Sequence, residues 1–498
     1  MKLPLLVYII CGIAIVAGLY LYRPTDLFFL ADDFLHIPES TDSFLLQRNS
    51  LRPVGNFSLY LDGIWSGKSP LGYHRTNLLL HFINSLLVFF LARQFVIRYE
   101  QSPSNQLPLL SSVLFFIYPF HSESIFWIIG RSASLGALFF LLAFILYFRN
   151  RHSLLSGLAI LLCFELALLS YESSWIFPII ITLIAIIEKR KSSLQRSYFL
   201  VSAIWLLFIV HLFLRFKTTG QIFHQYDTSA FLRFDIPGLL MNGCRLIARS
   251  FLPPFVNEYY LLGAFTIILF VLLGSIISLV KKRKLGTLFL VLIATLLLSY
   301  LPYLSLGIDT HGTEGERYLY LPSVFIAILL IYLLKLILKD GWFFVSFFVL
   351  YLFSLYYLGQ SRKYYTKAGT VVKTTLTEIN KLSNKRNIYI ENLPQYNKGA
   401  VIFRLGLEEG VKWLLPASNR NIIVVSIDDS DLKIRKHHHK NFIVNYQEST
   451  IPFLLRQILV KDPSFKKTYM SKDTVGLYFH PQTDAWLRYT DTSLIIIK

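Results

Sequence analysis

The sequence predicts an α-helical polytopic membrane protein with about eleven transmembrane helices and a small C-terminal α/β domain. Three observations predict this class. The 498 residues are 54% hydrophobic and 16% charged, with a mean hydropathy of +0.51, whereas a soluble domain carries about a quarter charged residues. Long apolar runs recur along most of the chain. Charge and short β-rich runs dominate only in its last part.

Eleven apolar runs are long enough, or nearly so, to cross a bilayer. A helix needs roughly 20 residues to cross the hydrocarbon layer, so the run at 107–120 is expected to continue into its flanks. No small-x-small cleavage site follows the first run, which favours a retained helix over a signal peptide. The runs lie at 4–22, 77–97, 107–120, 133–148, 153–170, 174–188, 197–214, 257–280, 285–304, 318–338 and 341–358.

One further segment is apolar on a single face. Residues 236–253, IPGLLMNGCRLIARSFLP, also carry Arg245 and Arg249. This pattern predicts an interfacial or re-entrant helix and not a span.

The positive charges predict the orientation of the chain. The net charge is +19, and lysines and arginines gather in every second short loop. Cytoplasmic loops carry such an excess, so we expect a cytoplasmic N-terminus and an extracytoplasmic C-terminal domain. Because these cations mark topology, nucleic acid is not an expected partner. The compact length and the lack of a eukaryotic retrieval signal favour a bacterial inner membrane.

The chain changes character after the last apolar run. The predicted division is a transmembrane domain over 1–358 and an extracytoplasmic α/β domain over 359–498. Residues 401–415 have the spacing of a helix. Strand-like runs occupy 386–393, 421–427, 441–446 and the tail TSLIIIK.

Polar residues stand out near the predicted extracytoplasmic ends of the helices. Ionisable groups close to hydrocarbon are costly and mark function by default. Each residue can also have a purely structural role. An aspartate can be a solvated loop residue or a helix N-cap, and Glu316 beside Arg317 can be a structural ion pair. The joint placement on one side favours a site. The residues are Asp32, Asp33, His121, Glu123, Arg131, Glu172, Glu316 and Arg317.

Five stretches of the chain carry a resemblance. They are ADDFLHI, the pair RPVGNFSLYLDGIW and GYHRTNLLLHFINSLLVFFL, YPFHSESIFWIIGRSASLGALFFLLAFILY, LLSYESSWIFP and GERYLYLPSV, in that order. In these stretches the chain resembles GT-C-type integral-membrane glycosyltransferases, in particular the transmembrane-and-tetratricopeptide-repeat protein O-mannosyltransferases and their bacterial relatives. The resemblance implies an extracytoplasmic active site and a donor sugar carried on a polyprenyl phosphate.

The resemblance also implies roles for individual residues. The acidic motif of the first outer loop falls on Asp32 and Asp33, which implies catalysis by these carboxylates. The family's His-x-Glu falls on His121 and Glu123, and its Glu-Arg-Tyr on Glu316, Arg317 and Tyr318.

Two features depart from the family. Tyr171 precedes Glu172 where relatives often have Lys-Glu, so a phosphate-binding cation is expected from elsewhere. No 34-residue period follows the spans, so we expect no tetratricopeptide array in residues 359–498.

Sugar transfer from a lipid phosphate needs a base, a cation and access from the bilayer. Asp32 or Asp33 can deprotonate the acceptor hydroxyl. Arg317 can bind the leaving phosphate through its planar fork. Glu316 can orient Arg317. His121, Glu123, Glu172 and Tyr318 are expected to position or bind substrate. Secondary phosphate-binding candidates are Arg131, Arg245 and Arg249.

Several alternatives stay open at this point. Asp33, His121 and Glu123 offer ligands that suit Mn²⁺ or Mg²⁺, although their spacing is not diagnostic. Direct attack at the anomeric carbon predicts inversion. The acceptor can be a protein or a glycolipid. The same charges could instead line the path of a lipid-linked sugar or polysaccharide transporter, but the chain shows no internal repeat of the transporter kind. A non-catalytic scaffold on this fold is the third possibility.

Overall fold

The computed structural model describes most of the transmembrane part and separate segments of the rest. The described residues are 3–42, 51–101, 104–150, 153–188, 194–220, 222, 235–255, 257–281, 286–385, 387–391, 393–403, 406–415, 421–425, 441–443, 474–476, 484–489 and 494–496. The chain forms two compact units. Unit 1 comprises Met1–Leu27, Glu39–Thr366 and Lys398–Ala400, and unit 2 comprises Phe28–Pro38, Lys367–Asn397 and Val401–Lys498.

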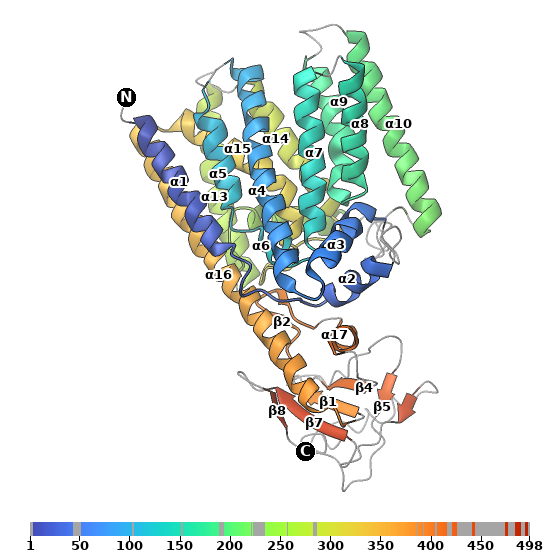
Figure 1. The fold of residues 1–498 in the computed structure, drawn as a ribbon. Helices are drawn as coiled ribbons and strands as arrows, with labels where there is room; N and C mark the ends of the chain where they lie inside the picture. Colours follow the sequence, from blue (N-terminus) through green and yellow to red (C-terminus); the bar gives the residue numbers. More distant parts are fainter. Residues whose placement is uncertain are drawn as a thin grey trace. The chain divides into compact units, whose positions relative to one another are not determined.

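Every predicted apolar run coincides with a helix. Figure 1 shows α4, α5, α7 and α15 packed side by side in unit 1. The eleven helices are α1 (Leu3–Leu21), α4 (Pro70–Phe95), α5 (Gln106–Phe116), α7 (Arg131–Asn150), α8 (Leu154–Leu168), α9 (Phe177–Glu188), α10 (Leu194–Thr219), α13 (Glu258–Lys281), α14 (Thr287–Tyr300), α15 (Tyr320–Ile337) and α16 (Asp340–Lys381).

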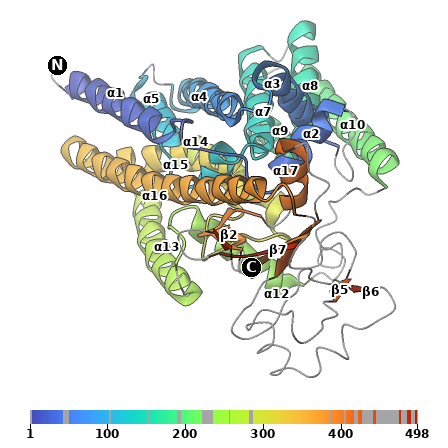
Figure 2. The ribbon, with the colours of Figure 1, turned by 60° about the horizontal axis from the view of Figure 1, so that its bottom comes forward.

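Six described helices have the length and composition of a membrane span. They are the helices α4, α7, α10, α13, α15 and α16, and shorter apolar helices accompany them. In its most apolar stretch α15 is 72% buried, whereas α13 is 11% buried. α15 therefore lies at the centre of unit 1, and Figure 2 shows α10 and α13 at its periphery. The predicted class, an α-helical multi-pass membrane protein, is confirmed.

The prediction for the run at 107–120 was wrong in its length. Helix α5 ends at Phe116 and does not extend into the flank. The Phe116 carbonyl instead accepts hydrogen bonds from Tyr22 Oη at 2.9 Å and from His81 Nε2 at 2.9 Å. These side chains satisfy a carbonyl that a continuing helix would use, so the chain can turn after α5.

Short helices connect the spans. The helical part of 236–253 is confirmed as α12 (Ile236–Arg249), which exposes Ile236 and Leu240 and buries Arg249. Its depth in a membrane stays a prediction. The other short helices are α2 (Asp33–Asp42), α3 (Pro53–Ser66), η1 (Val96–Glu100), α6 (Ser122–Phe126), η2 (Glu172–Ile176), η3 (Leu301–Tyr303) and η4 (Glu316–Leu319).

The last apolar helix is longer than predicted. The apolar run ends at 358, but α16 continues to Lys381. The continuation keeps a helical spacing of buried side chains, including Ala368, Val372 and Ile379, so burial supports it after its hydropathy falls. The predicted domain boundary at 358 and 359 therefore lies inside one helix, and the two units divide at Thr366 and Lys367.

Unit 2 contains the predicted α/β elements. Strand β1 (Asn387–Glu391) pairs in parallel with β4 (Asn421–Val425) and with β7 (Asp484–Tyr489), and β8 (Leu494–Ile496) pairs with β7 in antiparallel. The remaining elements are β2 (Tyr396–Asn397), β3 (Ala400–Val401), α17 (Leu407–Leu414), β5 (Asn441–Ile443) and β6 (Thr474–Gly476). The predicted strands correspond to β1, β4, β5 and β8, and the sequence pattern did not predict β2, β3, β6 and β7.

An N-terminal segment also belongs to unit 2. Residues Phe28–Pro38, which the sequence presented as an outer loop, pack within this unit. The Ala31 amide donates to the Ile402 carbonyl at 2.9 Å. Phe34 stacks on Phe403 with ring centroids 6.3 Å apart and meets the edge of Trp413 at 6.4 Å. Unit 2 therefore needs residues from both ends of the chain.

This packing predicts a local loss of stability for Phe34→Ala. Phe34 is 1% exposed, and removal of a buried phenyl ring costs about 3–5 kcal/mol. We expect limited proteolysis of unit 2 at lower protease concentration, with unit 1 unaffected. Phe57→Ala, at a ring that is 44% exposed, is the control. Equal protease resistance of both variants would contradict the assignment of Phe28–Pro38 to unit 2.

Candidate active site

A carboxylate from α6 and a guanidinium from η4 form the first part of the site. Glu123 Oε1 pairs with Arg317 Nη1, and Glu123 Oε2 accepts a hydrogen bond from the Arg317 amide at 3.0 Å. Arg317 also lies over the rings of Trp127, at 5.6 Å, and Tyr318, at 4.8 Å. Burial raises the pKa of the Glu123 carboxyl, and the Arg317 charge opposes this rise. The Glu123 side chain is 2% exposed and that of Arg317 is 17% exposed, so the cation is the accessible partner.

A second buried pair joins η4 to α12. Arg249 Nη2 lies 2.8 Å from Glu316 Oε1, and Ser122 Oγ donates to Glu316 Oε2. Arg249 also donates to the carbonyls of Leu252 at 2.6 Å and Asp309 at 3.2 Å. Both charged side chains of this pair are essentially unexposed. Because these bonds hold Glu316 beside α6, the pair fixes the start of η4.

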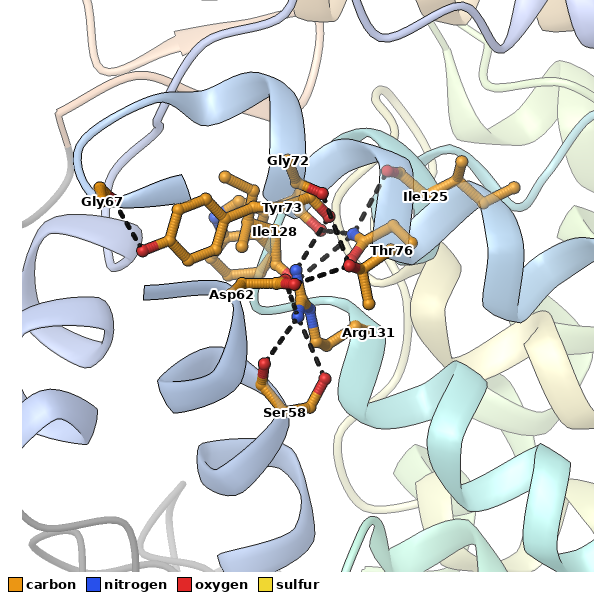
Figure 3. A network of polar contacts seen from close by, with 11 residues as sticks. Ser58, Asp62, Gly67, Gly72, Tyr73, Thr76, Ile125, Ile128 and Arg131 are labelled. Atoms are coloured by element: carbon orange, nitrogen blue, oxygen red, sulfur yellow. Dashed lines mark hydrogen bonds and ion pairs between the residues drawn. The ribbon is translucent and has the colours of Figure 1, made fainter. Parts of the chain in front are cut away.

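A third pair joins α3, α4 and α7. Figure 3 shows the Arg131 guanidinium between Asp62, Ser58 and the loop before α7. Arg131 Nη1 contacts Asp62 Oδ2 and donates to Ser58 Oγ at 3.0 Å, and Nη2 donates to the Tyr73 carbonyl at 2.8 Å. Thr76 Oγ1 donates to the other Asp62 oxygen at 2.6 Å. Arg131 is fully buried, so its position favours a role in holding the fold.

Glu172 is shared by two arginines. Its Oε2 lies 2.6 Å from Arg52 Nη2, and its Oε1 lies 2.9 Å from Arg215 Nη2. Arg52 lies over the Tyr171 ring at 4.8 Å, and Arg215 over the Trp175 ring at 5.5 Å. The Arg215 side chain is 2% exposed, yet its Nε and Nη1 have no hydrogen-bond partner among the described residues. Among the described residues, one carboxylate thus faces two guanidinium groups, which gives this group of side chains a net positive charge.

A row of tyrosines connects this triad to Arg317. Tyr171 lies 6.3 Å from Tyr303, and Tyr303 stacks on Tyr318 at 4.7 Å, measured between ring centroids. Burial raises the pKa of the Tyr171 phenol, and the charges of Arg317 and Arg52 oppose that rise. Both cations are therefore close to one ring. We call Arg52, Glu172, Arg215, Arg317 and the three tyrosines the arginine–tyrosine cluster.

His121 lies inside the bundle as a neutral ring. Its Nε2 is 2.7 Å from Ser323 Oγ, and that hydroxyl donates to the Tyr320 carbonyl at 2.7 Å. Nε2 therefore carries the proton. Nδ1 is buried without a hydrogen-bond partner in the part of the chain that the structure describes. Burial lowers the pKa of His121 well below its ordinary value, and the neighbouring His81 adds to this effect.

Asp32 and Asp33 lie at the start of α2, in the residues assigned to unit 2. Asp33 is fully buried, Asp32 is 8% exposed, and Asp33 Oδ2 accepts a hydrogen bond from the Leu30 amide at 2.9 Å. Ala31, just before them, has φ +43°, an uncommon conformation for a residue with a Cβ. This hydrogen bond runs back to the residue three places before Asp33, so it holds the turn that precedes α2. A common cleft with His121 and Arg317 stays a prediction.

The structure thus groups most, but not all, of the predicted site residues. His121, Glu123, Glu316, Arg317 and Tyr318 lie together, with Arg249 and Arg131 bound into the same region. Arg245 instead pairs with Glu258 on α13, with both side chains a quarter to a third exposed.

The sequence reasoning missed Arg52, Arg215 and Asp62. Arg52 stands at the head of the stretch RPVGNFSLYLDGIW, which also contains Asp62, and Arg215 follows directly after an apolar run. An arginine that directly follows an apolar run could have indicated a functional site.

The predicted metal ligands gain no support from unit 1. Both oxygens of Glu123 are occupied by Arg317. Within the described residues, no group of three or more His, Cys, Asp or Glu side chains could hold a metal ion. His121 and Glu123 therefore do not fit a divalent cation in this arrangement. A Mn²⁺ or Mg²⁺ requirement stays a prediction.

Comparison with known proteins supports the resemblance. The chain is 34% identical over 128 residues to the protein O-mannosyl-transferase Tmtc1 of Drosophila melanogaster, a match that covers 24% of this chain and 14% of that protein. It is 25% identical over 298 residues to the protein O-mannosyl-transferase F38B6.6 of Caenorhabditis elegans, covering 55% and 41%. The chain thus spans less than half the length of these relatives. No protein-family model matches it.

A solved structure shows a distant likeness. The crystal structure of ArnT from Cupriavidus metallidurans bound to undecaprenyl phosphate matches with a TM-score of 0.44 and 10% identity, covering 86% of this chain and 94% of that one. The resemblance to the O-mannosyl-transferases that the motifs predicted is confirmed by the sequence matches.

The burial of Arg131 predicts a large effect for Asp62→Asn. The substitution leaves a buried guanidinium without its counter-charge, which costs about 3–5 kcal/mol. We expect a clear fall in the thermal unfolding temperature in detergent. Glu258→Gln breaks the partly exposed pair with Arg245 and should cost about 1 kcal/mol or less. Similar shifts for the two variants would contradict a buried, structural Asp62–Arg131 pair.

The neutral His121 predicts a pH dependence with a defined sign. Unfolded histidine binds a proton below about pH 6.5, but the buried ring does not, so acid favours the unfolded state. Stability is expected to be full above pH 6.5 and to fall by about 1.4 kcal/mol for the first pH unit below it. The difference in unfolding temperature between the native chain and His121→Asn, measured at pH 8 and pH 5.5, isolates this group. A pH-independent difference would show that His121 is not held neutral.

Proposed function

We propose that the chain is a membrane glycosyltransferase that transfers a sugar from a polyprenyl-phosphate-linked donor to an acceptor hydroxyl on the extracytoplasmic side. Two observations support the class of protein: the multi-pass helical fold and the similarity to O-mannosyl-transferases. The observation that carries the proposal is the excess positive charge that the described residues give the arginine–tyrosine cluster, where two buried donors of Arg215 have no described hydrogen-bond partner. Such donors are suited to the oxygens of a phosphate.

The arginines would act on the leaving group. As the bond between the anomeric carbon and the phosphate oxygen breaks, an electron pair passes to that oxygen and its negative charge grows. Guanidinium groups that are already in place stabilise such a charge without reorganisation. Arg317 is partly exposed and Arg52 lies over the same tyrosine row, so both can face the phosphate together with Arg215.

The remaining predicted arginines have other tasks in this proposal. Arg131 and Arg249 are buried, and their guanidinium groups donate hydrogen bonds to carboxylates and backbone carbonyls. We therefore assign them to positioning, and we assign phosphate binding to Arg317, Arg52 and Arg215. Arg245, in a surface pair with Glu258, has no part in the reaction.

The acceptor would be activated by the first-loop acids. In this step Asp32 or Asp33 takes the proton of the acceptor hydroxyl while its oxygen forms a bond to the anomeric carbon. The phosphate leaves from the opposite face, so the product has inverted configuration. His121 can accept a hydrogen bond from a sugar hydroxyl at Nδ1, which has no hydrogen-bond partner among the described residues. Glu123, Glu316 and Tyr318 hold Arg317 in place, and Glu172 holds Arg52 and Arg215.

The proposal also places the reaction at the membrane surface. The lipid tail of the donor stays in the bilayer while its phosphate reaches the ends of the helices. A bacterial inner membrane, a cytoplasmic N-terminus and an extracytoplasmic C-terminal domain remain part of the proposal, because they follow from the loop charges. The acceptor is proposed to be a protein or a glycolipid.

Arg215→Gln tests the proposal. The chain is purified into lipid nanodiscs and supplied with polyprenyl-phosphate mannose and an acceptor extract of periplasmic protein and glycolipid. We expect sugar transfer by the native chain and a loss of about 100-fold or more in donor kcat/KM for Arg215→Gln, as for loss of one transition-state donor. Asp33→Asn should abolish transfer.

Arg23→Gln is the matched control. Arg23 forms an exposed pair with Asp26, with side chains 39% and 43% exposed, and we expect transfer to be unchanged. The proposal fails if the native chain transfers no polyprenyl-linked sugar. It fails equally if Arg215→Gln and Arg317→Gln both retain full activity.

A further inference from the structure

We infer that Lys398–Ala400, a segment beyond the last apolar helix, positions the loop that carries Glu316 and Arg317. The inference rests on the proposed function and adds a positioning element to the same site. Contacts assign Lys398–Ala400 to unit 1, apart from the residues on either side of it. The segment includes the turn between β2 and β3, and both turn residues have positive φ, +54° at Lys398 and +91° at Gly399. Two positive φ angles in a two-residue hairpin loop are the mark of a type I′ turn.

The turn meets the loop through the backbone. The Thr313 amide donates to the Lys398 carbonyl at 3.1 Å, and Thr313 Oγ1 approaches the same oxygen at 3.5 Å. A Cβ placed on Gly399 would lie 2.0 Å from the Thr313 nitrogen, and one placed on Gly312 would lie 2.9 Å from the Gly399 backbone. The two glycines therefore permit a contact that any side chain would prevent.

The same loop is held on another side by Arg249. This guanidinium donates to the Asp309 carbonyl at 3.2 Å and to the Gly312 carbonyl at 3.3 Å. Within the loop, the Asp309 amide donates to the Glu314 carbonyl at 3.2 Å. Arg249 and Lys398 thus hold a short loop at separate points, and the arginine also binds Glu316.

The loop leads directly into the site. The Glu316 amide donates to the Thr313 carbonyl at 3.3 Å, so Thr313 bonds the turn with its N–H and η4 with its C=O. Arg317 is the next residue. A shift of Thr313 would therefore move the start of η4, and misplacement of a phosphate-binding group by about 1 Å can cost 100-fold in rate. Nothing in the contact depends on the Lys398 side chain, since only its carbonyl is used.

The test compares glycine variants in the full chain, purified in detergent. Gly399→Val and, from the opposite side, Gly312→Ala should push the turn and the loop apart. Gly399→Ala is a milder version in case the valine variant misfolds. Gly220→Ala is the control, because Gly220 also has a positive φ, +73°, but open space around it. Hydrogen exchange of the peptide covering 309–317 is the readout of the loop, and binding of undecaprenyl phosphate and sugar transfer are the readouts of the site.

We expect Gly399→Val and Gly312→Ala to exchange at least about tenfold faster in this peptide, with unchanged exchange in α4 and α15. Binding of undecaprenyl phosphate should weaken about tenfold or more, and transfer per folded molecule should fall with it. Gly220→Ala should match the native chain in all three measurements. If the native chain transfers no sugar but the two variants still show faster exchange and weaker lipid binding, the positioning role of Lys398–Ala400 is supported and the proposed reaction is refuted. Unchanged exchange, or faster exchange with native lipid binding, would overturn the inference.

Discussion

The site depends on one constraint: a charge buried among packed helices must have a counter-charge. The ion pairs are Asp62 with Arg131, Glu316 with Arg249, and Glu123 with Arg317. Removal of one member of such a pair is costly because the other is left uncompensated. These pairs join short connecting helices to the spans. The ion pairs that neutralise the buried charges therefore also fix the positions of the loops at this end of unit 1. The apolar spans alone would leave those loops without defined positions.

Among the described carboxylates, Asp26 and Glu172 each pair with two arginines, and the proposed chemistry follows from Glu172, the less exposed of the two. Among the described residues, two donors of Arg215 also have no hydrogen-bond partner. Arg131 and Arg249 are each matched by one carboxylate, whereas a binding site for an anion needs an excess of cation before the ligand arrives. The stacked tyrosines connect this excess of positive charge to Arg317. The distinction separates arginines that hold the fold from arginines that are available to a phosphate.

Hydropathy could predict every apolar helix, because lipid imposes a long and nearly unbroken apolar run. It could not predict that α5 stops early, since its last carbonyl is satisfied by Tyr22, just after α1, and by His81 of α4. The motifs could predict Glu123 and Arg317, but the roles of Arg131 and Arg249 depended on burial, which composition does not reveal. Arg52 and Arg215 acquire meaning only when folding brings them to Glu172. Likewise, Phe34 looks like a loop residue until it meets Phe403.

A structure of the chain with bound polyprenyl phosphate tests the central claim most directly. We predict phosphate oxygens at hydrogen-bonding distance, about 2.7–3.2 Å, from Nε and Nη1 of Arg215 and from Arg317, with the Asp62–Arg131 and Glu316–Arg249 pairs unbroken. A phosphate bound to Arg131 or Arg249 with their carboxylates displaced would contradict it. So would a phosphate bound away from the arginine–tyrosine cluster, without contact to Arg215.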